Sequence, residues 1–291
     1  MKRLKIAVTG AGGFLNARLL HHYASKYEMI PLTRKDLNLT SAEETNRIIK
    51  EIRPDIIIHG AAMTATLECE KYPELAYQVN VEASWNLARA AQAMQAKMIF
   101  FSSEQVFNGN VEDGPYTEET KACPNTVYGK SKLEAEALLI KAIEHLWILR
   151  FSWLFGLPER NMPIGVNLFW NVIKAGLKGC SIKVPVKEYR GITYVYNIID
   201  HFDQIFDIPY GTYHFGSSNN LSTYETAVYI LEQLGAGKDQ IDKVIIPDHE
   251  QYQDKARDVR LAYEKIKGTG IPITTSQESI DRAINEYRFK L

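Results

Sequence analysis

Short apolar runs alternate with helical stretches along the first half of the chain. Each run is about three to five residues long and ends in polar or glycine-rich sequence, which predicts a strand. The predicted strands cover residues 6–8, 29–32, 55–59, 97–101 and 147–151. The third run contains three consecutive isoleucines and is typical of a strand that is buried on both faces.

The stretches between these runs have apolar residues at helical spacing. The predicted helices cover residues 14–23, 41–52, 74–95 and 127–145. Ser41, with Glu44 three residues later, is the expected N-cap of the second helix. Strands that alternate with helices predict an α/β fold with a doubly wound, parallel, Rossmann-type sheet. Beyond residue 156 the pattern is irregular, and it predicts a strand over 211–215 and an amphipathic helix over 222–234.

The composition narrows the class of protein. The chain has 291 residues, 45% of them hydrophobic and 24% charged, and its formal net charge is −1. This favours a folded protein with a sizeable core, and it gives no electrostatic reason for nucleic acid binding. Cys69, Cys123 and Cys180 are too widely spaced for a disulfide framework or a metal pair. No apolar run approaches the length of a membrane span. We therefore expect a cytoplasmic protein with no metal and no membrane or nucleic acid partner.

A glycine-rich turn joins the first predicted strand to the first predicted helix. It contains Gly10 and Gly13 and is followed directly by Phe14 and Leu15. Glycine lets the backbone turn tightly and come close to a pyrophosphate, and the helix N-terminus offers free N–H groups. Any tight turn can use glycine, but this position between strand and helix predicts a dinucleotide site.

Arg34 follows the second predicted strand. An acidic residue there suits the ribose hydroxyls of NAD, whereas a basic residue suits a 2′-phosphate. Arg34 therefore favours NADPH, with NADH as the alternative. The plain structural interpretation is a solvated surface arginine.

Tyr128 and Lys132 are four residues apart and share one face of a predicted helix. A neighbouring ammonium stabilises a phenolate, so this pair can pass a proton to the oxygen of a carbonyl that is being reduced. Ser103 follows the fourth predicted strand. Ligands of open α/β sheets sit at the carboxyl ends of the strands, so Ser103 is placed to hydrogen-bond the same carbonyl.

The order of these features resembles the extended short-chain dehydrogenase/reductases. Further segments resemble one branch of them, the dTDP-4-dehydrorhamnose reductases. The matching segments are HGAA at 59–62, SSEQVFNG at 102–109, PNTVYGKSKLEAE at 124–136, LRFSWLFG at 149–156, RGITYV at 190–195 and GTYHF at 211–215.

The resemblance implies an oxidoreductase of deoxysugar biosynthesis that uses NADPH to reduce the 4-keto group of a nucleotide-linked 6-deoxysugar. It implies that Tyr128 donates the proton, that Lys132 lowers the pKa of Tyr128, and that Ser103 orients the carbonyl. The residues implied at the cofactor are Gly10, Gly13, Phe14, Leu15, Arg34, Asn38, Leu39, Ala61, Ala62, Tyr128 and Lys132. The residues implied at the sugar nucleotide are Thr64, Glu104, Trp153 and Arg190.

Several positions depart from the pattern of that branch. Asn16 replaces its third glycine, which we expect to crowd the helix against the strand, and Asn38 replaces an aspartate on the adenine side. The pair Glu104-Gln105 offers one carboxylate, whereas a 4,6-dehydratase resembling its family needs two. The alternatives are another sugar-nucleotide epimerase or dehydratase, and a non-catalytic NADP-binding regulatory subunit resembling the β subunit of methionine adenosyltransferase.

These features predict a division into two domains. Residues 1–155, with a return segment at about 190–215, form the expected NAD(P)-binding Rossmann domain, and 156–291 supply most of a smaller nucleotide-sugar domain. Both ligands carry phosphates, so Arg257 and Arg260 are further candidates for local positive charge. Dimers are common among such enzymes, so a homodimer is one candidate assembly, and the sequence leaves the oligomeric state open.

Overall fold

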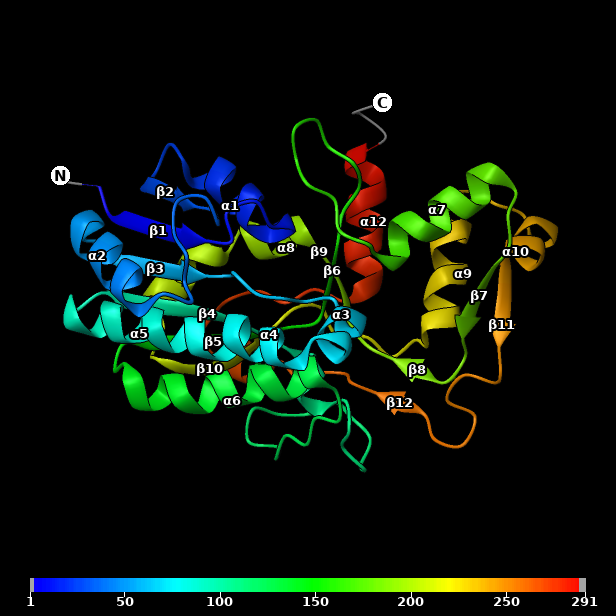
Figure 1. The fold of residues 1–291 in the computed structure, drawn as a ribbon. Coiled ribbons are helices and arrows are strands. Elements are labelled where there is room, and N and C mark those ends of the chain that lie inside the picture. The colour runs from blue at the N-terminus through cyan, green and yellow to red at the C-terminus, as the bar shows by residue number, and fades with distance from the viewer. Residues whose placement is uncertain (1–2, 288–291) are drawn as a thin grey trace. The chain divides into compact units, whose positions relative to one another are not determined.

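The computed structural model describes residues 3–287, which form two compact units (Figure 1). Of these residues, the N-terminal unit comprises 3–110, 121–150 and 205–213, and the C-terminal unit comprises 111–120, 151–204 and 214–287. The expected boundary near 155 therefore differs from the observed division in two ways. Residues 111–120 belong to the C-terminal unit because Tyr116 exchanges backbone hydrogen bonds with Arg260 and Ala262, and the segment that returns to the first unit is shorter than expected.

The N-terminal unit is built on a six-stranded sheet with the order β10-β5-β4-β3-β1-β2. The strands are β1 (Lys5–Thr9), β2 (Glu28–Leu32), β3 (Ile56–His59), β4 (Lys97–Ser103), β5 (Leu146–Phe151) and β10 (Gly211–Phe215). β2, β1, β3 and β4 pair in parallel, as predicted. β2 is an edge strand, which explains how it accommodates Pro31.

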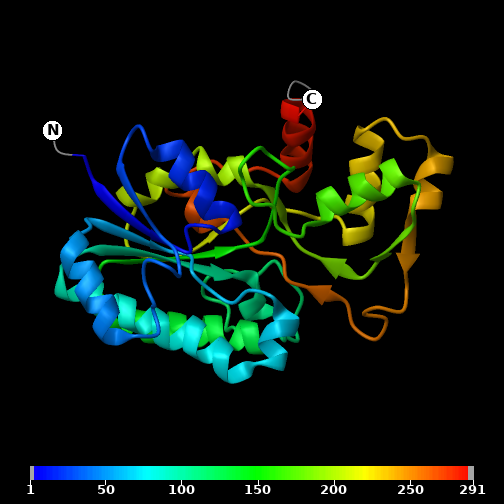
Figure 2. The same ribbon diagram turned by 45° about the horizontal axis from the view of Figure 1, so that its top comes forward.

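Helices cover both faces of this sheet (Figure 2). α1 (Phe14–Tyr23) lies on one face, and α2 (Ala42–Ile52), α5 (Ala83–Ala93) and α6 (Val127–Ala142) lie on the other. Apolar side chains from the second group of helices, including Ile49, Leu87 and Leu139, pack against Ile57 and Met98 of the sheet. The predicted α/β doubly wound fold is therefore confirmed. The expected cap is also present, because the Ser41 side chain accepts a hydrogen bond from the Glu44 backbone.

The predicted helix over 74–95 is more complex than the sequence pattern indicates. A short helix, α3 (Thr66–Lys71), precedes it, and α4 (Pro73–Tyr77) leads through a π-helical turn, η1 (Gln78–Glu82), into α5. A π turn inserts a residue into the helical ladder and is frequent at functional sites. Here it coincides with Asn80, which is fully buried.

The C-terminal unit contains three two-stranded sheets and several helices. β6 (Trp153–Phe155) pairs with β9 (Ile192–Tyr194), β7 (Ile182–Pro185) with β11 (Ile245–Asp248), and β8 (Glu188–Tyr189) with β12 (Arg257–Asp258). The expectation that residues near 193 return to the first sheet is therefore wrong. They pair with β6 instead, and β10 is the strand that joins the six-stranded sheet.

Helices complete the C-terminal unit. They are α7 (Leu168–Lys178), α8 (Val195–Ile199), α9 (Thr223–Gln233), α10 (Lys238–Val244), α11 (Glu264–Lys267) and α12 (Ser276–Tyr287). α9 matches the amphipathic helix expected over 222–234, and Ser222 and Glu225 form a capping box at its start. Among residues 3–287, no helix combines the length and the apolar character that crossing a lipid bilayer requires.

Candidate active site

The glycine turn lies at the end of β1, against the end of β3. Gly10 has a φ of +69°, and a Cβ atom there would lie 2.8 Å from the Cα atom of Ala61. Gly10 is therefore required by both the backbone conformation and the close approach of the two strand ends. A Cβ atom at Gly12 would meet nothing within 4 Å, so the outer side of the turn is open.

The N-terminus of α1 is suited to an anion. Gly13 is the N-cap and provides no side-chain hydrogen bond, and the first turn of α1 contains no acidic residue. Free backbone N–H groups and the positive end of the helix dipole are therefore available to a phosphate. Phe14 is half-buried and Leu15 is buried in the same turn. The residues of this turn fit the pyrophosphate of a dinucleotide.

Asn16 replaces a glycine without the crowding expected from the sequence. Its Nδ2 atom donates hydrogen bonds to the backbone oxygens of Thr9, at 2.9 Å, and Gly10, at 3.1 Å. The side chain is 3% exposed and lies over Gly60, where any Cβ atom would clash with it. Asn16 therefore ties the glycine turn to the strand ends, and the space that the larger residue needs is provided by Gly60.

The remaining residues expected at the cofactor lie on neighbouring strand ends. β1 has β2 on one side and β3 on the other, which makes the gap between β1 and β3 the topological switch point where ligands bind. Ala61 and Ala62 are half-buried at the end of β3, and Thr64 follows them on the surface. Arg34 is exposed at the end of β2, as a 2′-phosphate contact requires.

Asn38 has a local structural role. Its Oδ1 atom accepts hydrogen bonds from the backbone N–H and the hydroxyl of Thr40. The backbone oxygen of Leu39 accepts hydrogen bonds from Thr45 and Asn86, so this loop is held in place by α2 and α5. The expected contact of Asn38 with the cofactor stays a prediction.

Ser103 ends β4 and begins a short 3-10 helix, η2 (Glu104–Phe107). The Ser103 hydroxyl accepts a hydrogen bond from the backbone N–H of Gln105 and also hydrogen-bonds Tyr128. Glu104 is 1% exposed, and its carboxylate accepts a hydrogen bond of 2.9 Å from the Gln105 side chain. The acidic residue expected at the substrate is therefore buried beside the Ser103–Tyr128 pair.

Tyr128 and Lys132 lie on the buried face of α6, next to the end of β4. Thr126 caps the helix and fixes where its first turn begins. The Lys132 ammonium donates a hydrogen bond of 2.8 Å to the backbone oxygen of Phe101 and lies 6.0 Å from the centre of the Tyr128 ring. Ser103, Tyr128 and Lys132 are thus brought together within one unit, in the arrangement that the sequence predicts.

The pKa values of the two residues of α6 move in opposite directions. Burial raises the pKa of Tyr128, the Glu104 carboxylate raises it further, and the hydrogen bond from Ser103 lowers it. The lowering of the tyrosine pKa by the Lys132 ammonium, which lies 6.0 Å from the centre of the Tyr128 ring, stays a prediction. Burial lowers the pKa of Lys132 to about 8, although Glu136 opposes this shift. Tyr128 is therefore a protonated acid at neutral pH.

A chain of buried hydrogen bonds connects the glycine turn to α6. The Ser84 hydroxyl donates to the Asn80 backbone oxygen, so it accepts from Nε2 of His59. Burial, with a smaller effect of Lys132, lowers the pKa of His59 to about 3, and its neutral ring accepts from Thr9 through Nδ1. Asn80 then donates to Ser131, one residue before Lys132. These bonds fix the helix relative to the turn.

A buried ion pair involves Glu136, which lies one helical turn after Lys132 on α6. Arg150 donates two hydrogen bonds to Glu136, at 3.0 and 2.6 Å, and the Ser102 hydroxyl donates a third. The two charged side chains are 8% and 4% exposed. Their geometry is the bidentate one that makes buried pairs of arginine and carboxylate strong.

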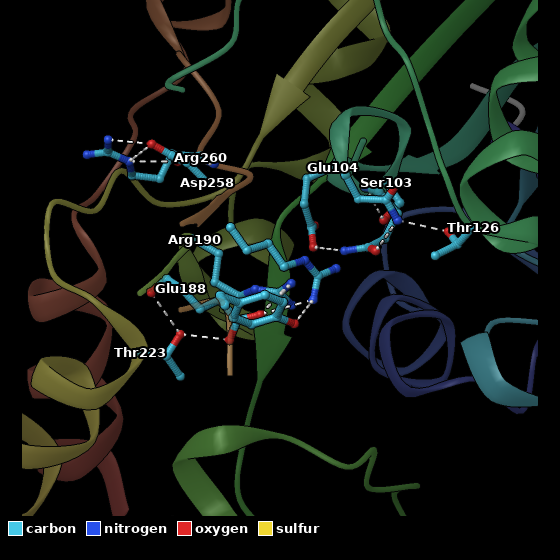
Figure 3. Close-up of polar contacts among 12 residues, drawn as sticks. Ser103, Glu104, Thr126, Glu188, Arg190, Thr223, Asp258 and Arg260 are labelled. Carbon is cyan, nitrogen blue, oxygen red and sulfur yellow. Dashed lines mark hydrogen bonds and ion pairs between the residues drawn. The ribbon is translucent and has the colours of Figure 1, made fainter. Parts of the chain in front are cut away.

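Trp153 and Arg190, both expected at the sugar nucleotide, lie in the C-terminal unit and contact each other. The Arg190 guanidinium stacks on the Trp153 ring at 3.7 Å from its centre. Trp153 is 41% exposed, whereas Arg190 is 2% exposed. Figure 3 shows Arg190 beside Glu188, and it shows Arg260 in a separate pair with Asp258.

A cavity of about 650 Å³ is lined entirely by residues of the C-terminal unit. It combines aromatic, basic and acidic side chains with an apolar floor from α7 and β7. Its lining includes Trp153, Lys174, Lys178, Lys183, Glu188 and Arg257. Sequence analysis identified Trp153 and Arg257 here and missed the others, because these residues come from separate segments and carry no local signature.

Comparisons with known proteins agree with this geometry. A family model described as the RmlD substrate binding domain matches residues 4–289. The dTDP-4-dehydrorhamnose reductase of Aggregatibacter actinomycetemcomitans is 31% identical over 243 residues, which cover 80% of each chain. Methionine adenosyltransferase 2 subunit beta of Bos taurus is 28% identical over 242 residues, 78% of this chain and 71% of that protein.

A solved structure has the same fold over nearly its full length. It is the dTDP-4-dehydrorhamnose reductase of Bacillus anthracis in complex with NADP. The TM-score is 0.87 at 27% sequence identity, and the match covers 98% of this chain and 100% of that one.

Proposed function

Because the chain belongs to the RmlD substrate-binding domain family, we propose that it reduces the 4-keto group of a nucleotide-linked 6-deoxysugar, as a dTDP-4-dehydrorhamnose reductase does. The observation that carries this proposal is the buried group formed by Ser103, Tyr128 and Lys132 at the carboxyl end of β4. A proton donor, an orienting hydroxyl and a nearby ammonium are the groups that proton transfer to a carbonyl oxygen uses.

The proposed reaction gives each of these residues one task. Ser103 orients the carbonyl through its hydroxyl, and Tyr128 donates its phenolic proton to the carbonyl oxygen as negative charge develops there. Lys132 stabilises the phenolate that Tyr128 becomes. The buried position of Tyr128 keeps its proton in place until a stronger base, the developing alkoxide, is present.

NADPH is the proposed cofactor, and when bound it supplies a hydride to the carbonyl carbon. The open glycine turn and the N-terminus of α1 would hold its pyrophosphate, and Arg34 would contact the 2′-phosphate. Ala61 and Ala62 would allow the cofactor to lie close to the end of β3. The known structure with NADP supports this choice over NADH.

The direct test is consumption of NADPH by the purified protein with dTDP-4-dehydrorhamnose, followed as loss of absorbance. We expect turnover with this substrate, and none when the ketone has already been reduced. Binding of NADPH without turnover of any 4-keto sugar nucleotide would contradict the proposed reaction. It would favour the second candidate function, that of a non-catalytic regulatory subunit. The similarity to methionine adenosyltransferase 2 subunit beta supports that candidate.

The rate should fall as the pH rises through about 8, because Lys132 loses its proton there. Tyr128 stays protonated over the same range, so Lys132 sets the basic limb of the profile. The measurement is kcat/KM from about pH 6 to about pH 10. Lys132→Arg should move this limb upward, since a guanidinium keeps its charge. A wild-type profile that is flat to the upper end would contradict the prediction.

A further inference from the structure

Glu188 lines the cavity in the C-terminal unit and is 5% exposed. Its Oε1 atom contacts two guanidiniums, that of Arg190 at 3.3 Å and that of Arg257 at 3.1 Å. Its Oε2 atom accepts a hydrogen bond of 2.9 Å from the Thr223 hydroxyl, as Figure 3 shows. Both carboxylate oxygens are therefore engaged by the protein itself.

We propose that Glu188 is a positioning residue for the nucleotide part of the substrate. It acts through the two arginines that it holds, and it makes no contact with the ligand of its own. This inference rests on the proposed function, because it takes a nucleoside diphosphate as the chemical class that enters the cavity.

The two arginines are each paired with an aromatic ring. Arg190 is stacked on Trp153, and Arg257 lies over Tyr252 at 5.7 Å and donates a hydrogen bond of 3.0 Å to its hydroxyl. The carboxylate of Glu188 thus holds two guanidiniums, and each guanidinium is paired with one aromatic ring. We call each of these pairs a platform. Such platforms suit the planar base and the sugar face of a nucleotide.

The rest of the cavity supplies charge for the phosphates. Lys174 and Lys178 lie on one face of α7, and Lys183 lies on the adjacent strand β7. Together with Arg257 they make the cavity strongly cationic. The negative charge of Glu188 weakens the attraction of this cavity for anions. Another function of the side chain therefore has to explain why a carboxylate stands there. Holding two like-charged guanidiniums close together is that function, because without it they would repel each other.

The test uses Glu188→Gln, which keeps the size of the side chain and an acceptor for Thr223 but removes the charge. Binding of thymidine diphosphate, measured by titration calorimetry, should be about ten-fold weaker. In the proposed reaction KM should rise by a similar factor while kcat and the Kd of NADPH stay unchanged. If Glu188 only offset the positive charge of the cavity, removing its charge would have the opposite effect. Binding of thymidine diphosphate, which carries two or three negative charges, would then be tighter.

Glu286→Gln is the matched control. Glu286 lies in the same unit and, like Glu188, binds an arginine and a hydroxyl, at 2.7 Å from each of Arg282 and Tyr194. It does not line the cavity, so binding of thymidine diphosphate should match that of the wild type. Thr223→Val is a second variant, which keeps all charges and removes the hydroxyl that contacts Oε2 and the backbone oxygen of Glu188. We expect weaker binding of the ligand than in the wild type, but by a smaller factor than in Glu188→Gln.

The outcomes separate the two proposals. Equal or tighter binding of thymidine diphosphate by Glu188→Gln would overturn the role of Glu188. Weaker binding by this variant in a chain that turns over no 4-keto sugar would support the role and contradict the reaction. A wild-type chain with no affinity for thymidine diphosphate at millimolar concentration would contradict both.

Discussion

Replacing Tyr128 with phenylalanine should lower kcat by about a hundred- to ten-thousand-fold, the range for losing a positioned general acid. Phenylalanine keeps the ring that packs against Cys69 and Ala76, so the fold should persist. Only the hydroxyl that hydrogen-bonds Ser103 is lost. The measurements are steady-state turnover of the 4-keto sugar nucleotide and, separately, the Kd of NADPH, which should not change.

Tyr213→Phe is the control for this substitution. Tyr213 is also buried in the N-terminal unit, and its hydroxyl donates a hydrogen bond of 2.9 Å to the backbone oxygen of Pro209. Removing that hydroxyl takes away a partly buried hydrogen bond that involves none of the residues proposed for the reaction, so turnover should match the wild type. Wild-type turnover by Tyr128→Phe would exclude this residue as the proton donor, whatever its effect on stability.

The strands of the central sheet could be predicted because each is a nearly continuous apolar run. Residues 56–58 are buried on both faces, and a run of isoleucines is the direct consequence. The pairing of β9 with β6 could not be predicted. Each strand has three residues, they are separated by about forty positions, and no periodicity can be recognised over so short a length.

The placement of the proposed catalytic residues was predictable for a different reason. Tyr128 and Lys132 are local to one helix, and Ser103 ends a strand whose direction in the sheet is fixed by the fold class. Their electrostatics were not predictable. The pKa of Tyr128 depends on burial and on Glu104, which comes from another element, and neither can be read from the spacing of a tyrosine and a lysine.

Asn16 shows how a departure from a family pattern can be misinterpreted from sequence. A larger residue in place of glycine predicts crowding, but the partner that makes room for it is Gly60, more than forty residues away. The polar side chain also gains two backbone acceptors that glycine cannot use. The turn is therefore cross-linked by hydrogen bonds, and its shape does not depend on a third glycine.

Glu136→Gln should lower the free energy of unfolding by about 3–5 kcal/mol, because it leaves the Arg150 guanidinium buried without its counter-charge. The burial of Glu136 cannot be predicted from the sequence, because a glutamate within KLEAEALL is typical of the solvent-exposed face of a helix. Urea unfolding followed by circular dichroism measures the change. Glu51→Gln, in an exposed pair with Arg47, should change the same quantity by less than about 0.5 kcal/mol.

The same substitution should also be visible in catalysis. Glu136 raises the pKa of Lys132, so without its charge the ammonium is lost at a lower pH. The basic limb of the kcat/KM profile of Glu136→Gln should therefore lie below about 8 under conditions where the variant is folded. A destabilised variant with the wild-type pH profile of kcat/KM would show that the ion pair stabilises α6 without changing the pKa of Lys132. A shifted profile would show that one buried carboxylate serves both the stability of the helix and the charge of its lysine.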